Sequence, residues 1–344
     1  MAELTYRPWR EGDDQLLVQV WGDAEGAAAE QFRGAFAPDS EGGQDPDGGS
    51  GSHGIWRRCV VAEDQGIPVA AGVVFSSPLH PQRLWAYVEV ARDHRRAGVG
   101  SELLRRLRAA AAAAPSWAVH SVGQAHDGAA PRLRSRVPAG GAGAAFAAAR
   151  GFGELQRSRH VVVRPGALRL SALGDGSQGS ESSPLVEDLA TGSVELSDTV
   201  GRYYTEVHAW DPPAPLGVGR AQQLFLSDAA GAHGAVVLRE PPASAFGSGV
   251  APSRKGRLRA FAVSYAGPAT ALAEEPSEVF LGHEPRLSPE EARDAVRDLL
   301  ALIAYQHPVR LEVDDAMTAL TAVVGPLVAA GSAEAGPETI VVGD

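Results

Sequence analysis

The chain has 344 residues, 44% of them hydrophobic and 21% charged, so it is long enough to bury more than one core. Its formal net charge of −11 argues against nucleic acid as a partner, and no apolar run approaches the roughly 20 residues that cross a bilayer. The N-terminal residues lack the pattern of a signal peptide, and Cys59 is the only cysteine. We therefore expect a cytoplasmic protein that binds neither nucleic acid nor membrane.

Two polar segments rich in glycine and serine divide the chain. Residues 38–54 have almost no apolar content, and residues 174–184 have the composition of a linker between domains. The sequence therefore predicts an N-terminal domain over residues 1–170, a linker over 171–186 and a C-terminal domain over 187–344.

The first half alternates short strands with helices. In chain order, the apolar spacing predicts a strand at 6–8, helices at 13–21 and 25–36, strands at 56–63, 68–76 and 84–90, a helix at 101–114, a strand at 118–122, a helix at 141–150 and a closing strand at 155–164. Pro115 and Gly151 stand where the two later helices are expected to end.

The second half loosely repeats this order. It predicts helices at 198–208 and 219–226, strands at 234–239, 257–265 and 278–283, a helix at 288–305, a strand at 309–313, a helix at 316–324 and a strand at 339–342. Ser288, followed by proline and two glutamates, is a helix N-terminus, and Asp314 with Asp315 is expected to cap the next helix. The shared order of elements predicts that the two halves arose by a weak internal duplication.

The stretch RRAGVGSELLRRL, residues 95–107, links the strand at 84–90 to the helix after it. The first N–H groups of a helix have no internal partner and lie at its positive end. Gly98 and Gly100 would let a ligand approach the backbone, and Arg92, Arg95 and Arg96 add positive charge. Such a turn is typical of a phosphate site, although the same glycines also suit a tight turn without a ligand.

Arg95, Gly98 and Gly100 match a Q/R-x-x-G-x-G/A motif, and in this the chain resembles the GNAT superfamily of acyl-CoA N-acyltransferases. Val90 matches the end of the family's fourth strand, and Phe146 with Gly151-Phe152 matches a second motif; Arg92 replaces a usual proline. The first half matches, and the second lacks the glycine pair. The resemblance to tandem, mycothiol-synthase-like GNAT proteins implies an α/β (α+β) fold of two GNAT-like domains, each a mixed, mostly antiparallel sheet flanked by helices, with the second domain degenerate.

The resemblance also implies a donor substrate, acetyl-CoA or another acyl-CoA, and the residues that hold it. The backbone of the loop would bind the CoA pyrophosphate, the strand end would pair with the pantetheine arm, and the Val90 N–H would be the oxyanion donor. The implied cofactor-binding residues are Val88, Val90, Arg95, Arg96, Ala97, Gly98, Val99, Gly100 and Ser101.

The family's usual proton-transfer positions are vacant. Many members have a glutamate six residues before the strand-end valine and a tyrosine four residues before the glycine of Gly-Phe, where this chain has Leu84 and Ala147. Glu89 is the only carboxylate of the strand at 84–90 and is therefore our candidate base, with a structural acid as the alternative. Catalysis by positioning and the oxyanion donor alone, groups lent by the second half, and CoA binding without turnover all remain open.

We therefore expect an enzyme, an N-acyltransferase that moves an acyl group, acetyl by default, to the primary amine of a small molecule in a direct ternary complex. A non-catalytic acyl-CoA sensor or scaffold and a protein amine acetyltransferase are the alternatives. His126-Asp127 and the carboxylate of Asp211 beside His208 and Trp210 are further candidates, although surface or ordinary packing explains both. The ten histidines show no metal-binding spacing, and the sequence leaves a homodimer open.

Overall fold

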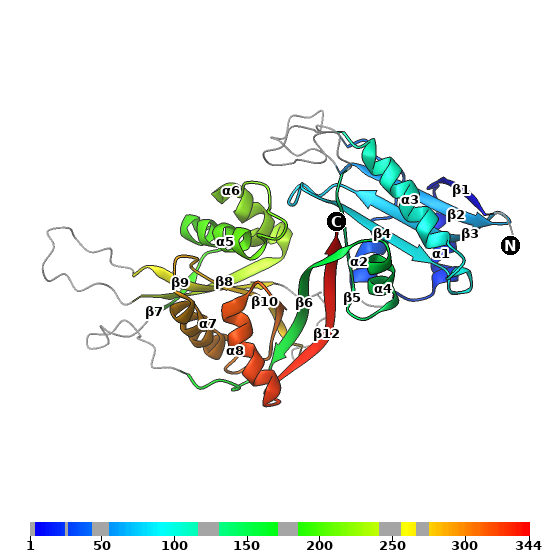
Figure 1. Cartoon of the computed structure of the whole chain (residues 1–344). Coiled ribbons are helices and arrows are strands. Elements are labelled where there is room, and N and C mark those ends of the chain that lie inside the picture. Colours follow the sequence, from blue (N-terminus) through cyan, green and yellow to red (C-terminus); the bar gives the residue numbers. More distant parts are fainter. Residues whose placement is uncertain are drawn as a thin grey trace, which may run out of the picture. The chain divides into compact units, whose positions relative to one another are not determined.

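The computed structural model describes residues 4–24, 27–42, 55–115, 131–170, 185–240, 256–265 and 275–344. The chain forms two compact units, neither of them continuous in sequence. Unit 1 consists of Met1–Leu155, Asp211–Ala214 and Thr339–Asp344, and unit 2 consists of Gln156–Trp210 and Pro215–Glu338. The helices and strands of both are labelled in Figure 1.

The sheet of unit 1 is mixed. Its strands are β1 (Thr5–Pro8), β2 (Arg57–Asp64), β3 (Ile67–Phe75), β4 (Leu84–Val90), β5 (Leu133–Pro138) and the end of β12 (Ala333–Gly343). Strands β1 to β4 pair antiparallel in chain order, β4 pairs with β5 in parallel, and β5 pairs antiparallel with Thr339–Gly343 of β12.

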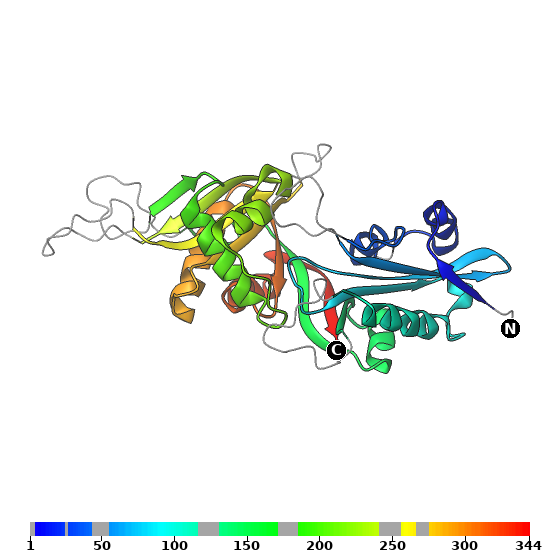
Figure 2. The same ribbon diagram turned by 90° about the horizontal axis from the view of Figure 1, so that it is seen from above.

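Helices cover both faces of this sheet. One face carries α1 (Asp13–Trp21) and α2 (Ala27–Arg33), and the other carries α3 (Val99–Ala112) and α4 (Ala142–Ala149), with the short 3-10 helix η1 (Arg92–His94) leading into α3. Figure 2 shows α3 and the dark-blue helices α1 and α2 on opposite sides of the strands. Alternate residues of each strand point to opposite faces, so Val61 and Val73 pack toward α1 while Ala86 and Val74 pack toward α3.

Unit 2 has the same strand topology. Strands β7 (Leu185–Leu189), β8 (Ala232–Arg239), β9 (Leu258–Tyr265) and β10 (Ser277–His283) pair antiparallel, β10 pairs in parallel with β11 (Val309–Asp314), and β11 pairs antiparallel with β6 (Gly153–Val163). Its helices are α5 (Val194–Val207), α6 (Val218–Ala221), α7 (Pro289–Ile303) and α8 (Thr318–Ala329), with the π-helix η3 (Gln222–Leu226) and the 3-10 helix η4 (Asp228–Ala230). The expected fold class is confirmed: two similar α/β units with mixed, mostly antiparallel sheets.

Each sheet is closed by a strand from the other half of the sequence. The strand expected to close the first half becomes β6, whose residues Ser158–Val163 pair with β11 in unit 2. The C-terminal strand β12 instead closes unit 1, where Ile340 and Val342 join the core beneath α3 and α4. The compact units therefore differ from a division at residues 171–186, because strand exchange leaves no trace in local periodicity.

Some expected elements are shifted, missed or outside the described residues. Strand β5 was not expected, because the alternation of LRSRVP places arginines rather than apolar residues on one face. The expected strand at 118–122 and most of the linker lie outside the described residues. Residues 38–42, expected to be unstructured, are described, and Ser40 pairs with Arg57. The helix start expected at Ser288 is confirmed, and Ser288 forms a capping box with Glu291 at the start of α7.

Candidate functional site

The site begins where β4 and β5 separate. These parallel strands pair only at Leu84 with Leu133 and at Trp85 with Arg134. Beyond Trp85 the described residues provide no strand partner on this edge of β4, which leaves a gap between the ends of the two strands. In unit 1 the two strands therefore separate after their first two residues.

The backbone of β4 points polar groups into this gap. The N–H of Leu84 donates to the carbonyl of Arg132 on the β5 side, and the N–H of Ala91 donates to Val69 on the β3 side. Because the N–H groups of an extended strand alternate between its two edges, those of Val88 and Val90 point into the gap. Both can therefore donate to a ligand there.

The loop after β4 turns sharply into α3. Arg96 has a φ of 64° and Gly98 a φ of 85°, both in the left-handed region, and Gly98 is the N-cap of α3 without a capping side chain. The first N–H groups of α3 therefore face outward at the positive end of the helix. A Cβ on Gly100 would lie 3.6 Å from the ring of Phe146, so this glycine leaves room between α3 and α4.

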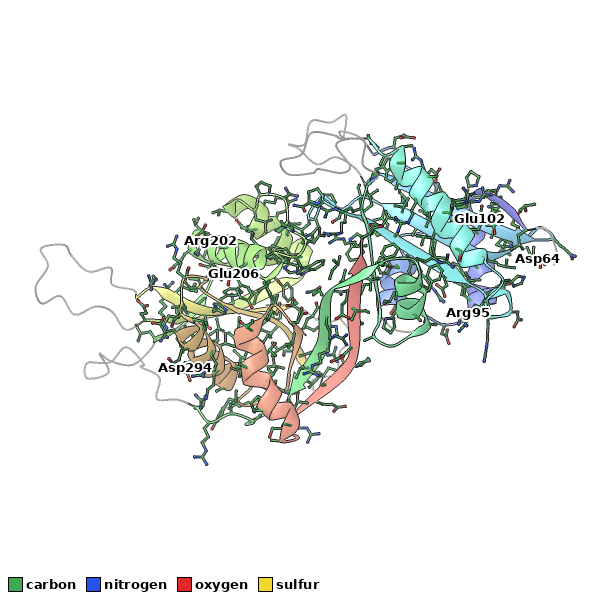
Figure 3. All side chains as sticks on the ribbon, in the orientation of Figure 1. Asp64, Arg95, Glu102, Arg202, Glu206 and Asp294 are labelled. Atoms are coloured by element: carbon green, nitrogen blue, oxygen red, sulfur yellow. The ribbon has the colours of Figure 1, made fainter. Side chains whose placement is uncertain are left out.

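One pocket of about 550 Å³ collects nearly all the residues expected from the sequence. It is lined by Val88, Val90, Arg95, Arg96, Gly98, Val99, Gly100 and Ser101, and also by the candidate base Glu89. Ala97 lies exposed in the same loop but is not part of the lining. Figure 3 labels Arg95 of this loop and Glu102 in the first turn of α3.

The lining is strongly basic. Besides Arg95 and Arg96 it contains Arg136 of β5 and Arg150 after α4, neither of which was expected from the sequence. Arg150 lies over the ring of Phe146, four residues earlier, a spacing that would have revealed it. The Arg95 Nε donates to the Val90 carbonyl at 3.0 Å, which ties the loop to the strand end. Four arginines suit a ligand with several phosphate groups.

Glu89 lines the same pocket but points to the opposite face of β4 from Val88 and Val90. Its carboxylate accepts hydrogen bonds from Arg33 of α2 and from the hydroxyl of Tyr87. Protonating Glu89 would cost the ion pair with Arg33, which favours the structural alternative over a base.

The other positions considered from the sequence offer no replacement. Leu84 is fully buried, and burial raises the pKa of the Cys59 thiol to about 12, so this cysteine is a poor nucleophile. His126 and Asp127 lie outside the described residues. Among the described residues, no cluster of side chains could hold a metal ion, and no helix is long and apolar enough to cross a membrane.

The sequence makes Asp211, beside His208 and Trp210, a candidate to bind the amine acceptor. In the structure, however, Asp211 is not available to an acceptor. It is fully buried in unit 1, where its carboxylate accepts from Arg83 and Arg134. The His80 Nδ1 lies 2.7 Å from the Asp211 carbonyl. This carboxylate balances two buried arginines and therefore has a structural role.

Solved structures share this architecture. A GCN5-related N-acetyltransferase from Sphaerobacter thermophilus matches with a TM-score of 0.55 at 12% identity, over 99% of this chain and 95% of that one. A tandem GNAT protein from the clavulanic acid biosynthesis pathway matches with a TM-score of 0.50 at 15% identity, over 99% and 98%. The chain has the tandem GNAT fold. No protein-family model and no curated protein matches its sequence.

Unit 2 has the same separation of strands but a different helix start. Strands β10 and β11 also pair only at their first two residues. At the start of α7, however, the Ser288 hydroxyl and the Glu291 carboxylate occupy the end of the helix, and Glu290 adds negative charge. These groups would repel an anion from the place where unit 1 offers free N–H groups.

The helix that corresponds to α4 is also different in unit 2. Helix α8 buries Leu320, Val323, Val324 and Leu327 in the core of its unit. Asp314 was expected to cap this helix, but the N-cap of α8 is Met317 without a capping side chain; the Asp314 carboxylate instead accepts the N–H groups of Ala316 and Met317 in the turn before the helix. The residues expected to hold CoA, apart from Ala97, line one pocket of unit 1.

Proposed function

We propose that unit 1 binds an acyl-CoA and that the protein is an N-acyltransferase that acylates a primary amine of a small metabolite or natural product. The observation that carries this proposal is the single pocket in which the loop Arg95–Ser101, the free edge of β4 and four arginines come together. The N–H groups of the loop would hold the pyrophosphate, and Val88 would pair with the pantetheine arm.

The reaction follows from where the strand end points its backbone. The N–H of Val90 would donate to the thioester carbonyl oxygen, on which negative charge develops. The amine nitrogen attacks the carbonyl carbon, a C–N bond forms, and the C–S bond breaks. The amine gives its proton to solvent or to a base, and the departing thiolate takes one up. Positioning of the two reactants supplies the main acceleration.

The state of the two expected proton-transfer positions favours a second candidate, a non-catalytic acyl-CoA sensor. Glu89 is engaged with Arg33, and Ala147 offers no hydroxyl to the leaving thiolate. Glu89 as the base therefore stays a prediction that mutation must test. The net charge of −11 favours a cationic acceptor through long-range attraction.

Release of free CoA thiol separates the two candidates. The full chain is incubated with a series of acyl-CoAs and a panel of primary amines, with Gly100→Trp as a control that blocks the loop. Thiol release that depends on an amine supports the enzyme. CoA binding without such release would favour the sensor, and unchanged CoA affinity in Gly100→Trp would show that the loop is not the binding site.

A further inference from the structure

The pocket of unit 1 reaches into the hydrophobic core. Five of its lining residues are core side chains with 4–9% exposure, and we call them the core recess: Ala86, Leu104, Ala147, Phe152 and Val342. Protein cores are packed as densely as organic crystals, and openings into them are few. A recess of this kind is therefore suited to a ligand that fills it.

Small side chains on α4 create the space. The helix has the sequence AGAAFAAA, and Ala142, Gly143 and Ala147 all line the pocket. The corresponding helix α8 of unit 2 carries leucines and valines, which fill its own core. The space beside this helix is therefore filled by side chains in unit 2 and open in unit 1. Unit 1 is also the unit that contains the proposed phosphate-binding loop.

The chemistry of the recess selects its occupant. Its five side chains are aliphatic or aromatic and offer no hydrogen bond, whereas the arginines lie among the remaining lining residues. A pantetheine arm contains two amide groups, which would lose their hydrogen bonds to water in such surroundings. A hydrocarbon chain has no hydrogen bonds to water to lose, and its burial contributes favourable free energy.

We propose that the core recess binds the acyl chain of the donor, and that the preferred donor is an acyl-CoA with an unbranched aliphatic chain longer than acetyl. This inference rests on the proposed function, because it takes the loop of unit 1 as the CoA cradle. The acyl chain would enter beside Ala147, which is the buried residue of α4 and lines the pocket.

Binding measurements test the proposal without an acceptor. The affinity of the full chain is measured by calorimetry for CoA and for acetyl-, butanoyl-, hexanoyl- and octanoyl-CoA. Each added methylene should tighten binding by up to about fourfold until the recess is full. Ala147→Phe should remove this gradient, so that the variant binds octanoyl-CoA no more tightly than acetyl-CoA. Ala148→Phe, on the exposed side of α4, is the matched control and should keep the gradient.

A second variant guards against misfolding of the first. Ala86→Val narrows the recess from β4 instead of α4 and should also weaken the dependence on chain length. Equal affinity for all acyl-CoAs in the unmodified protein, or a gradient that survives both recess variants, would overturn the inference while CoA binding still supports the proposed function. Absence of binding to CoA itself would instead refute the proposed function.

Discussion

Arg33 and Glu89 form a two-point ion pair that joins α2 to β4, with Nη2 2.5 Å from Oε1 and Nε 2.9 Å from Oε2. Their side chains are only 15% and 12% exposed. The hydrogen bond from Arg33 to Glu89 raises the pKa of the guanidinium, so Arg33 remains charged. The same guanidinium also donates to the Gly22 carbonyl, which extends the connection to the end of α1.

This ion pair predicts the behaviour of Glu89→Gln. If Glu89 anchors α2, the variant should lose about 1–3 kcal/mol of unfolding free energy and keep its rate within about tenfold, whereas loss of a general base costs about 10²–10⁴-fold. Urea unfolding and thiol release measure the two quantities. Arg33→Met should share the stability loss. A large rate loss in Glu89→Gln alone, with unchanged stability, would instead identify the base.

Gly98 and Gly100 should respond differently to alanine. Gly98 has a φ of 85°, so Gly98→Ala should cost about 1–2 kcal/mol of unfolding free energy through backbone strain. A Cβ on Gly100 meets no atom closer than 3.6 Å, so Gly100→Ala should fold normally and weaken CoA binding only by crowding the cradle. Chemical unfolding and calorimetry distinguish the two effects. Equal destabilisation by both substitutions would contradict the described loop geometry.

Asp211→Ala should strongly destabilise unit 1. It removes the buried carboxylate that accepts from both Arg83 and Arg134. Breaking a buried ion pair in this way costs about 3–5 kcal/mol. Asp294→Asn on α7 is the control, because Asp294 is 55% exposed, and it should change stability by less than about 0.5 kcal/mol. A similar small effect at Asp211 would show that the cluster contributes little.

His80 predicts an acid-dependent loss of stability. Burial, with the positive charge of Arg134, lowers the pKa of His80 to about 4. Between about pH 6.5 and pH 4 the unfolded chain binds a proton at this histidine and the folded chain does not, so stability falls as the pH falls. The loss amounts to about 3 kcal/mol at most.

His80→Asn tests this prediction, because the asparagine amide can still donate to the Asp211 carbonyl but does not titrate in this range. The difference in unfolding free energy between the unmodified protein and the variant should change between pH 7 and pH 4.5. A difference that is constant with pH would show that His80 is not the titrating group.

The loop after β4 could be predicted from the sequence, whereas strand β5 could not. The loop after Val90 is local, since the positive φ angles of Arg96 and Gly98 determine its shape within a few residues. Strand β5 depends instead on distant contacts, because its buried Arg134 is balanced by Asp211 from another part of the chain. No local pattern shows that an arginine in a short polar segment belongs to a core.

The core recess is a second feature that could not be predicted from local sequence. An alanine-rich segment such as Ala142–Ala149 predicts a helix, but it does not predict the space that its small side chains leave in the folded protein. Only the arrangement of α4 against β4 and β12 shows that Ala147 faces a pocket instead of filled core. Ala147, at the position where many members of the family have a tyrosine, therefore leaves a space that the sequence motif alone did not reveal.

The exchange of closing strands also determines when the protein can finish folding. Strand β5 is synthesised about 200 residues before its partner segment Thr339–Gly343. At the usual rate of translation, this is a delay of roughly 10–40 s. During that time the nascent chain carries an unpaired strand edge, which is a hazard for association with neighbouring chains.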